Sequence, residues 1–337
     1  MNNILITGAG GEVGFSLIHE LKKNKENFVV ATSLNNLSPQ SEKECDKFYT
    51  VDITDKNSLE KVFNKYRFDT IFHLASILST GGEKNPELAI NVNTIGSVNV
   101  IEAATRQGLS VKKAIKFLFP SSIAAYGIPT LAAKKKSGKV KEGEFGNPIT
   151  IYGITKISIE NIGLYFSKNY QMLANIDRNS LIDFRCVRFP GLLSPDTLPS
   201  GGTSDFGSEM IHSAAQGKDY ACFVRPDAKI PFMAMQDAVR GIIKLSEAPR
   251  KSLTTKIYNI RGFSPSALEI EEEAHKLFPG TKITYKVNKV RQGIIDSWPE
   301  DLDDALAQED WGFRAEYDFK KTFEEYLLPK IRQRYNL

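Results

Sequence analysis

Ile4-Leu-Ile-Thr-Gly-Ala-Gly-Gly-Glu-Val-Gly14 is the stretch that decides the fold of this 337-residue sequence. It opens as a short apolar strand and continues into a turn with glycines at positions 8, 11 and 14, where a helix would begin. Glycines at this spacing permit a tight turn, let backbone N–H groups approach a pyrophosphate, and bring helix and strand close together. A glycine-rich turn can also be no more than a turn. Its position after a first strand, however, predicts a dinucleotide-binding unit.

The first 190 residues repeat this alternation of strand and helix. Short apolar runs predict strands at Ile4–Thr7, Phe28–Thr32, Thr70–Leu74, Ala114–Phe119 and Phe184–Val187. Longer segments between them predict helices near Gly14–Lys23, Ser58–Tyr66, Asn91–Arg106 and Tyr152–Asn169. Such alternation predicts an α/β fold of the Rossmann type, a doubly wound parallel sheet with helices on both faces.

The alternation loosens after Pro190, where residues 192–208 are rich in Gly, Pro, Ser and Thr. We therefore expect a dinucleotide-binding domain over residues 1–190 and a smaller, mainly substrate-binding lobe over residues 191–337. A strand near residues 256–260 is expected to return to the sheet of the first domain.

Three further local predictions concern single segments. Ser264-Pro-Ser266 opens a helix that continues to about Phe278, with acidic residues in its early turns. Lys282–Val287 is expected to be a strand of the C-terminal lobe. The run Lys134–Lys136 is expected to be a solvated loop rather than a binding patch.

Composition excludes several classes of protein. The chain is 41% hydrophobic and 25% charged with a net charge of +4, which excludes intrinsic disorder. No apolar run approaches the ~20 residues of a membrane-spanning helix, no secretory signal is visible, and the basic residues are dispersed. Neither a membrane nor nucleic acid is therefore an expected partner. Cys45, Cys186 and Cys222 form no paired motif, and no histidine has metal-ligand spacing, so we expect a cytoplasmic protein with no metal site.

Tyr152 and Lys156 are the first candidate catalytic residues. Residues four apart on a helix share one face, and a nearby ammonium is expected to lower the pKa of a tyrosine toward the range of a general base. Many such pairs are ordinary surface residues. Ser122 changes that expectation, because it follows Phe119-Pro-Ser at the carboxyl end of a predicted central strand, where open α/β sheets bind their ligands.

These features, in this order, resemble the extended short-chain dehydrogenase/reductase superfamily and, within it, the NAD-dependent epimerase/dehydratase family. Asp52 in Val-Asp-Ile, His73-Leu-Ala-Ser76 and Asn93 support the resemblance, as does Tyr126 four residues after Ser122. The resemblance implies NAD as the cofactor. The cofactor-binding residues that it implies are Gly8, Gly11, Glu12, Val13, Gly14, Ser33, Asp52, Ile53, Leu74, Ala75, Asn93, Tyr152, Lys156 and Pro190.

The second half resembles the short-chain type of L-threonine 3-dehydrogenase. The segments that carry this likeness are Leu78-Ser79, 83–86, 188–194, Gly201-Gly-Thr-Ser-Asp-Phe206, 230–238, Ser297-Trp-Pro-Glu300 and 311–318. The resemblance implies an oxidoreductase that converts the 3-hydroxyl of L-threonine to a ketone, giving 2-amino-3-oxobutyrate. In it Tyr152 is the base, Ser122 orients the oxygen, and Lys156 holds the nicotinamide ribose.

The same resemblance implies the substrate contacts and the assembly. The small-molecule substrate, a hydroxy-amino acid, would be bound by Ser79, Ser122, Tyr152, Gly191, Thr203, Ser204 and Trp298. Trp298 fits either a substrate contact or a core position, while Trp311 is expected in the core. A homodimer would form through the helices near residues 91–106 and 152–169.

The sequence departs from this family at two places. Ser33 stands where the threonine dehydrogenases have an aspartate that favours NAD, and no arginine follows to meet a 2′-phosphate, so NADP is not excluded. Asn147-Pro-Ile-Thr-Ile151 lacks the arginine usual before the catalytic tyrosine.

Two alternative functions stay open. One is a nucleotide-sugar epimerase or dehydratase that shares Ser122, Tyr152 and Lys156, and the other is a catalytically inactive NAD(P)-binding regulatory protein.

Overall fold

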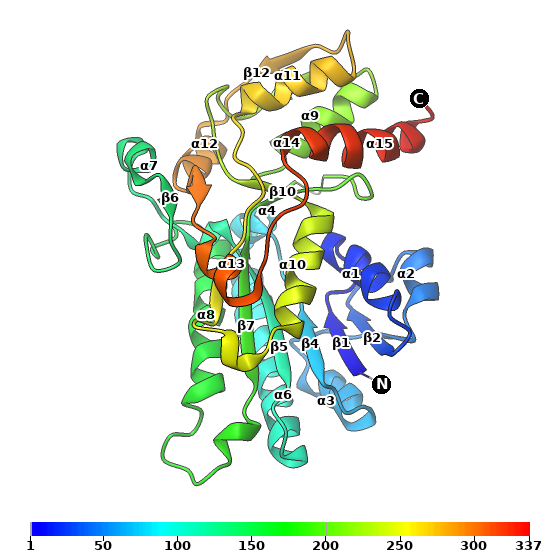
Figure 1. The fold of residues 1–337 in the computed structure, drawn as a ribbon, viewed down its shortest axis with the longest axis vertical. Helices are drawn as coiled ribbons and strands as arrows, with labels where there is room; N and C mark the ends of the chain where they lie inside the picture. The colour runs from blue at the N-terminus through cyan, green and yellow to red at the C-terminus, as the bar shows by residue number, and fades with distance from the viewer. Residues whose placement is uncertain (1, 200) are drawn as a thin grey trace. The chain divides into compact units, whose positions relative to one another are not determined.

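A seven-stranded sheet is the centre of the computed structural model, which describes residues 2–199 and 201–337 (Figure 1). Its strands, in spatial order, are β11 (Ile257–Asn259), β7 (Asp183–Phe189), β5 (Lys116–Ser122), β4 (Thr70–His73), β1 (Asn2–Thr7), β2 (Asn27–Ser33) and β3 (Lys47–Thr50). The pairs from β5 through β3 are parallel. This confirms the predicted doubly wound α/β fold and the return of the strand near residue 257 to the sheet.

Helices connect these strands, as parallel pairing requires. They are α1 (Glu12–Lys22), α2 (Pro39–Glu44), α3 (Lys56–Lys65), α4 (Ser79–Lys84), α5 (Pro86–Ile90), a π-helix (Asn91–Gly96) that continues into α6 (Ser97–Val111), α8 (Ile151–Lys168) and α10 (Met235–Glu247). The helix predicted over residues 91–106 is thus a π-helical turn followed by an α-helix. Strand β3 was not predicted, because it is an edge strand of four residues with exposed ends.

The chain forms two compact units, and neither is one continuous stretch of sequence. The first unit comprises residues 1–121, 154–187 and 239–258, and the second comprises residues 122–153, 188–238 and 259–337. Residues 122–153 thus belong with the second unit although they precede the predicted boundary at residue 190.

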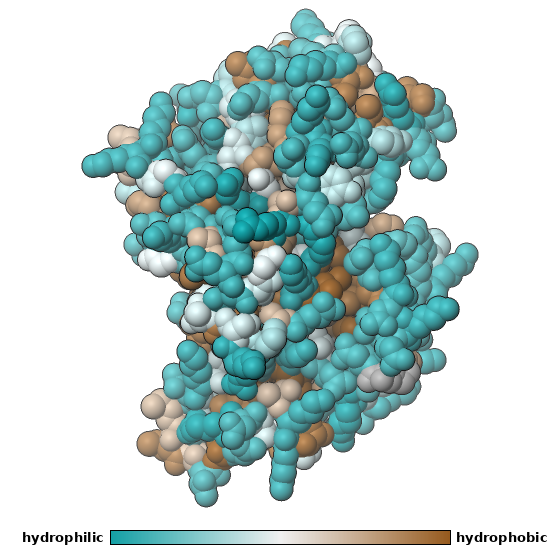
Figure 2. Space-filling model, in the orientation of Figure 1, coloured by the Kyte–Doolittle hydropathy of each residue, from teal (hydrophilic) through white to brown (hydrophobic). Residues whose placement is uncertain are grey.

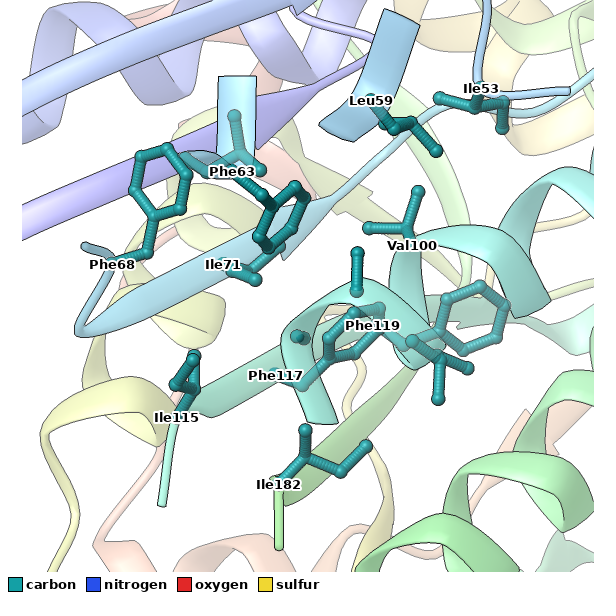
Figure 3. Close-up of a cluster of buried hydrophobic side chains, with 14 of the residues drawn as sticks. Ile53, Leu59, Phe63, Phe68, Ile71, Val100, Ile115, Phe117, Phe119 and Ile182 are labelled. Carbon is teal, nitrogen blue, oxygen red and sulfur yellow. The ribbon is translucent and has the colours of Figure 1, made fainter. Parts of the chain in front are cut away.

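The hydrophobic core of the first unit lies between the sheet and its helices (Figure 3). Leu5, Ile71 and Phe117 on neighbouring strands are fully buried, and Val100 of α6 packs into the same cluster. Complete burial of one such side chain contributes about 1.5–3 kcal/mol to folding. This core fixes the carboxyl ends of β1, β4 and β5, where the predicted site residues begin.

Two glycines of the turn after β1 are required by close backbone contacts. Gly8 has a φ of +70°, and a Cβ there would lie under 3.0 Å from the backbone of Ala75. A Cβ at Gly14 would lie under 3.0 Å from the backbone of Ala9. Gly11, by contrast, meets nothing closer than the Gly8 carbonyl oxygen at 3.4 Å.

The Gly14→Ala variant should therefore be less stable by about 1–3 kcal/mol, because backbone cannot move aside as a side chain can. Gly11→Ala is the matched control, and we expect a smaller loss for it. Denaturant unfolding of the two variants measures both losses. Equal stability of the two would contradict the tight packing of helix against strand at Gly14.

The second unit contains three two-stranded sheets and a set of helices. The strand pairs are β10 (Phe232–Ala234) with β8 (Gly191–Leu193), β12 (Ile283–Tyr285) with β9 (Tyr220–Cys222), and β13 (Asp301–Leu302) with β6 (Lys139–Val140). The helices are α7 (Leu131–Ser137), α9 (Phe206–Ala215), α11 (Ala267–Leu277), α12 (Lys289–Asp296), α13 (Ala305–Trp311), α14 (Phe319–Lys321), a π-helix (Thr322–Leu327) and α15 (Leu328–Tyr335). The predicted helix over 266–278 and the predicted strand over 282–287 are confirmed as α11 and β12.

The prediction of a solvated loop at Lys134–Lys136 is wrong. These residues lie in α7, and Lys134 is buried with its Nζ donating to the Ile295 carbonyl oxygen at 2.8 Å. A run of lysines is typical of an exposed segment, and only Lys135 and Lys136 behave that way. The apolar stem of Lys134 can be buried because a carbonyl oxygen meets its ammonium.

Candidate active site

Ser122 and Tyr152, two of the three predicted catalytic residues, are hydrogen-bonded to each other. Ser122 ends β5, and its Oγ accepts the backbone N–H of Ala124 at 3.1 Å. Tyr152 lies in the first turn of α8, half-buried, and burial raises the pKa of its hydroxyl to about 12, while the hydrogen bond with Ser122 acts in the opposite direction. The two side chains can therefore share one substrate oxygen.

The direction of this pKa shift is opposite to the expected one. The sequence suggested that the ammonium of Lys156 would lower the pKa of Tyr152. In the structure, removal of the phenol from water raises the pKa of Tyr152, because a phenolate loses more solvation than a neutral phenol, and the opposing influence comes from the hydrogen bond with Ser122.

Lys156 is itself buried on the same helix, one turn further on. Its Nζ donates to the Pro120 carbonyl oxygen at 2.8 Å and lies 4.7 Å from the centre of the Phe119 ring. Burial lowers the pKa of Lys156 to about 8, while Cys186 and Glu160 act to raise it. The ammonium is therefore still mainly protonated at neutral pH, within an apolar environment.

The glycine turn fits a pyrophosphate. Gly11 is the N-cap of α1, and Glu12 and Val13 are its first helical residues, so the helix terminus that favours an anion begins at this turn. A Cβ at Gly10 would lie 2.9 Å from the Ser33 Oγ, so the carboxyl end of β2 meets the turn closely. Ser33 is thus placed where the sequence pattern expects the residue that contacts the adenosine ribose.

The remaining predicted cofactor residues of the first unit follow β3 and β4. Asp52 is exposed, with its Oδ1 accepting from the backbone N–H and the hydroxyl of Thr54, while the next residue, Ile53, is buried. Leu74 and Ala75 are half-buried directly after β4. Each is compatible with a cofactor contact, which stays a prediction.

Asn93 has a positioning role that the motif did not reveal. Its Oδ1 accepts the Ile77 N–H at 2.7 Å, and its Nδ2 donates to the Ile77 carbonyl at 3.0 Å and to the Thr155 Oγ1 at 3.2 Å. These bonds fix the segment after β4 against α8. Direct contact between Asn93 and a cofactor stays a prediction.

His73, which the sequence analysis names only as part of a segment that supports the family resemblance, has a structural role. It is fully buried, and its ring nitrogens lie 2.6 Å from the Thr7 hydroxyl and 2.8 Å from the Ser97 hydroxyl. Burial, with the charge of Lys156, lowers the pKa of His73 to about 3, so the ring is neutral. The bonds link β1, β4 and α6 below the site.

Besides Ser122 and Tyr152, the predicted substrate residues of the second unit lie in three segments: Gly191 begins β8, Thr203 and Ser204 precede α9, and Trp298 follows α12. Thr203 is buried and Ser204 half-buried, and a Cβ at Gly191 would lie 3.4 Å from that of Ser204. Pro190 is buried beside Gly191 at the end of β7. Trp298 is 4% exposed, so the structure alone suits both interpretations of this residue.

Two predictions concern side chains elsewhere in the chain. Ser79, in the first unit, is buried as the first residue of α4. Trp311 is buried with its ring centre 5.3 Å from that of Phe313, which agrees with the expected core position.

Comparison with known proteins places this site in context. The model of the NAD dependent epimerase/dehydratase family matches residues 4–260. The mitochondrial L-threonine 3-dehydrogenase of Bos taurus is 33% identical over 326 residues, which are 96% of this chain and 81% of the relative. The solved L-threonine dehydrogenase of Clostridium difficile is 35% identical with a TM-score of 0.86 and covers 99% of this chain and 98% of its own.

A third relative bears on assembly. A solved monomeric L-threonine 3-dehydrogenase from a metagenome is 34% identical, with a TM-score of 0.85 over 98% of this chain and 99% of its own.

Across residues 2–199 and 201–337, no helix is both long and apolar enough to cross a bilayer.

Proposed function

Because this chain belongs to the NAD dependent epimerase/dehydratase family, we propose that it is an L-threonine 3-dehydrogenase that oxidises the 3-hydroxyl of L-threonine to give 2-amino-3-oxobutyrate. One observation carries the proposal: L-threonine dehydrogenases match almost the whole chain, including the second unit with the predicted substrate residues. A screen of hydroxy-amino acids for NAD reduction tests it, with L-threonine expected to be the best substrate. Faster turnover of a different class of alcohol would contradict it.

The catalytic roles follow from the chemistry of three side chains. Tyr152 accepts the hydroxyl proton, and Ser122 donates to or accepts from the same oxygen and keeps it in place. The Lys156 ammonium favours the phenolate against the effect of burial. Bound NAD supplies the acceptor for the hydride that leaves the same carbon.

The binding roles are assigned to the residues that the family resemblance implies. Backbone N–H groups of the turn between Gly8 and Gly14 would hold the pyrophosphate, with Ser33 near the adenosine ribose. Ser79, Gly191, Thr203, Ser204 and Trp298 would enclose the amino acid. Hydroxyl and backbone groups of this kind suit a small zwitterion, because they pair with both its ammonium and its carboxylate.

Cofactor preference is the first property that distinguishes this chain within the proposal. An aspartate at position 33 would accept hydrogen bonds from the ribose and repel a 2′-phosphate, whereas Ser33 offers no charge. We expect NAD to be used with weakened discrimination against NADP. Ser33→Asp should shift the preference toward NAD by roughly tenfold or more, since a hydrogen bond to a charged group contributes about 1.5–3 kcal/mol.

The ratio of kcat/KM for NAD and NADP in parent and variant measures this shift. Asn35→Asp is the control, since it adds the same charge two residues further along at an exposed position. If the parent already excludes NADP by several orders of magnitude, another residue selects the cofactor.

A homodimer in the cytoplasm is the form in which we propose that the protein works. Ile95, Ile154 and Tyr165 are exposed on the π-helix and α8, at 49%, 44% and 44%. Figure 2 also shows hydrophobic atoms around the end of α8, where Met172 and Leu173 are exposed. Sedimentation should give the mass of a dimer, and Ile154→Glu should reduce it. A parent of monomer mass would match the monomeric relative and contradict this part.

A further inference from the structure

We propose that helix α12 positions both substrate segments of the second unit. Arg291 attaches α12 to the first segment, and Lys134 holds the end of α12 from which the second segment continues. The segments are Gly201–Asp205, which contains Thr203, and Ser297–Trp298. This inference rests on the proposed function, which assigns both segments to the amino-acid substrate. Neither Arg291 nor Lys134 belongs to the substrate-binding set, and each acts through the backbone that it holds.

Arg291 fixes the first segment. Its Nη2 donates to the Gly202 carbonyl oxygen at 2.6 Å, directly before Thr203. The guanidinium carbon also lies 3.2 Å from the centre of the Phe223 ring, so a cation–π contact holds the same group. A planar donor held by both a ring and a carbonyl oxygen has little freedom to move.

The Gly201–Asp205 segment is closed by its own carboxylate. Asp205 Oδ2 accepts the N–H groups of Gly201 and Gly202 at 2.8 and 2.6 Å. A Cβ at Gly202 would lie 2.7 Å from the Asp205 Oδ1, so a side chain there would displace the carboxylate that closes the turn. The turn is therefore a small rigid body, and Arg291 attaches it to α12.

Lys134 fixes the other end of α12. Its buried Nζ donates to the Ile295 carbonyl oxygen, which also accepts the Trp298 N–H at 3.2 Å. The Ile128 N–H donates to the Ser297 carbonyl at 2.8 Å. A cation at a helix C-terminus is favoured by the helix dipole. Here the Lys134 ammonium binds the same carbonyl oxygen that accepts the N–H of Trp298. Figure 1 shows α7, which carries Lys134, beside α12.

Helix α12 can link the two segments because it is anchored along its length. The Asn288 side chain caps it by accepting the N–H groups of Val290 and Arg291. Near its other end, Arg225 pairs with both carboxylate oxygens of Asp296 at 2.9 and 3.0 Å. Two planar groups paired in this way hold a fixed geometry. A change at either end therefore displaces both segments.

The test compares Arg291→Met and Lys134→Met with two matched controls, Lys289→Met on the exposed side of α12 and Lys135→Met beside Lys134. Each site variant keeps an apolar stem and loses the donor. We expect the KM for L-threonine to rise about tenfold or more in each site variant, since a buried carbonyl loses a charged donor. The KM for NAD should stay near that of the parent, and both controls should behave as the parent.

Two further measurements separate positioning from a general loss of structure. If both residues act through α12, the double variant should raise the KM by less than the product of the single effects. Arg291→Lys keeps a cation that can reach the Gly202 carbonyl, so its KM should lie between those of the parent and Arg291→Met. A parallel rise in the KM for NAD, or an unchanged KM for L-threonine in folded Arg291→Met, would overturn the inference.

Hydrogen exchange distinguishes failure of this inference from failure of the proposed function. A parent that does not oxidise L-threonine would contradict the proposed function alone. Arg291→Met should still speed amide exchange in peptides covering residues 201–206, and Lys134→Met in those covering residues 295–300, relative to their controls. Unchanged exchange in both variants would show that α12 does not hold these segments.

Discussion

Replacing Tyr152 by phenylalanine is expected to lower the turnover of L-threonine by roughly 10²–10⁴, the usual range for loss of a general base. The ring stays in place, so folding and NAD binding should be those of the parent. Only the hydroxyl that is paired with Ser122 is removed. Steady-state kinetics and calorimetric NAD titration measure the two properties separately.

Tyr165→Phe is the matched control, because Tyr165 lies on the same helix with an exposed side chain. It should keep parental turnover. Near-normal turnover in Tyr152→Phe would contradict the assignment of the base, whereas loss of activity in both variants would indicate damage to α8.

Replacing Lys156 by methionine is expected to lower kcat/KM for L-threonine by roughly 10²–10³, comparable to removal of one donor that stabilises a developing negative charge. The ammonium lies in an apolar environment beside Phe119, where a charge acts more strongly than in water. Methionine fills much of the same volume and removes only the charge and the donor. Lys168→Met, at the exposed end of the same helix, should keep parental activity.

The pH dependence of NAD binding gives an independent test of Lys156. Burial lowers the pKa of Lys156 to about 8, so in the protein without bound NAD the ammonium loses its charge as the pH rises through that value. If the ammonium donates to the nicotinamide ribose, NAD should bind more weakly above about pH 8 in the parent. Lys156→Met should bind weakly on both sides of that pH, and Lys168→Met should follow the parent. A parental affinity that is constant from neutral to alkaline pH would contradict a cofactor contact by this residue.

Most of the first unit could be predicted because its signals are local. The glycine turn and the buried strands are read within a few residues, and the sheet places the strand ends together. The Tyr152–Lys156 spacing on α8, whose first residues belong to the second unit, is read in the same way. Strand β3 was missed because an exposed edge strand needs little apolar sequence. The π-helix at Asn91–Gly96 was merged with α6, because both have the periodicity of a helix.

The interactions that the sequence did not reveal are those between distant residues. Lys134 is separated from Ile295 by 161 positions, and Arg291 from Gly202 by 89. A single lysine in a basic run, or a lone arginine on a short helix, gives no signal of such partners. The sign of the pKa shift of Tyr152 was also missed, because burial of a helix face depends on packing that spacing alone does not determine.

The most direct test of the proposed function is a paired measurement on the purified chain, with L-threonine in one arm and UDP-glucose in the other. Reduced-nicotinamide absorbance follows turnover, and calorimetry follows binding. We expect L-threonine to reduce NAD and UDP-glucose neither to bind nor to react. Tight UDP-glucose binding without threonine-dependent reduction of NAD would contradict the proposal and favour a nucleotide-sugar epimerase or dehydratase. NAD binding without turnover of either compound would instead favour a catalytically inactive regulatory protein.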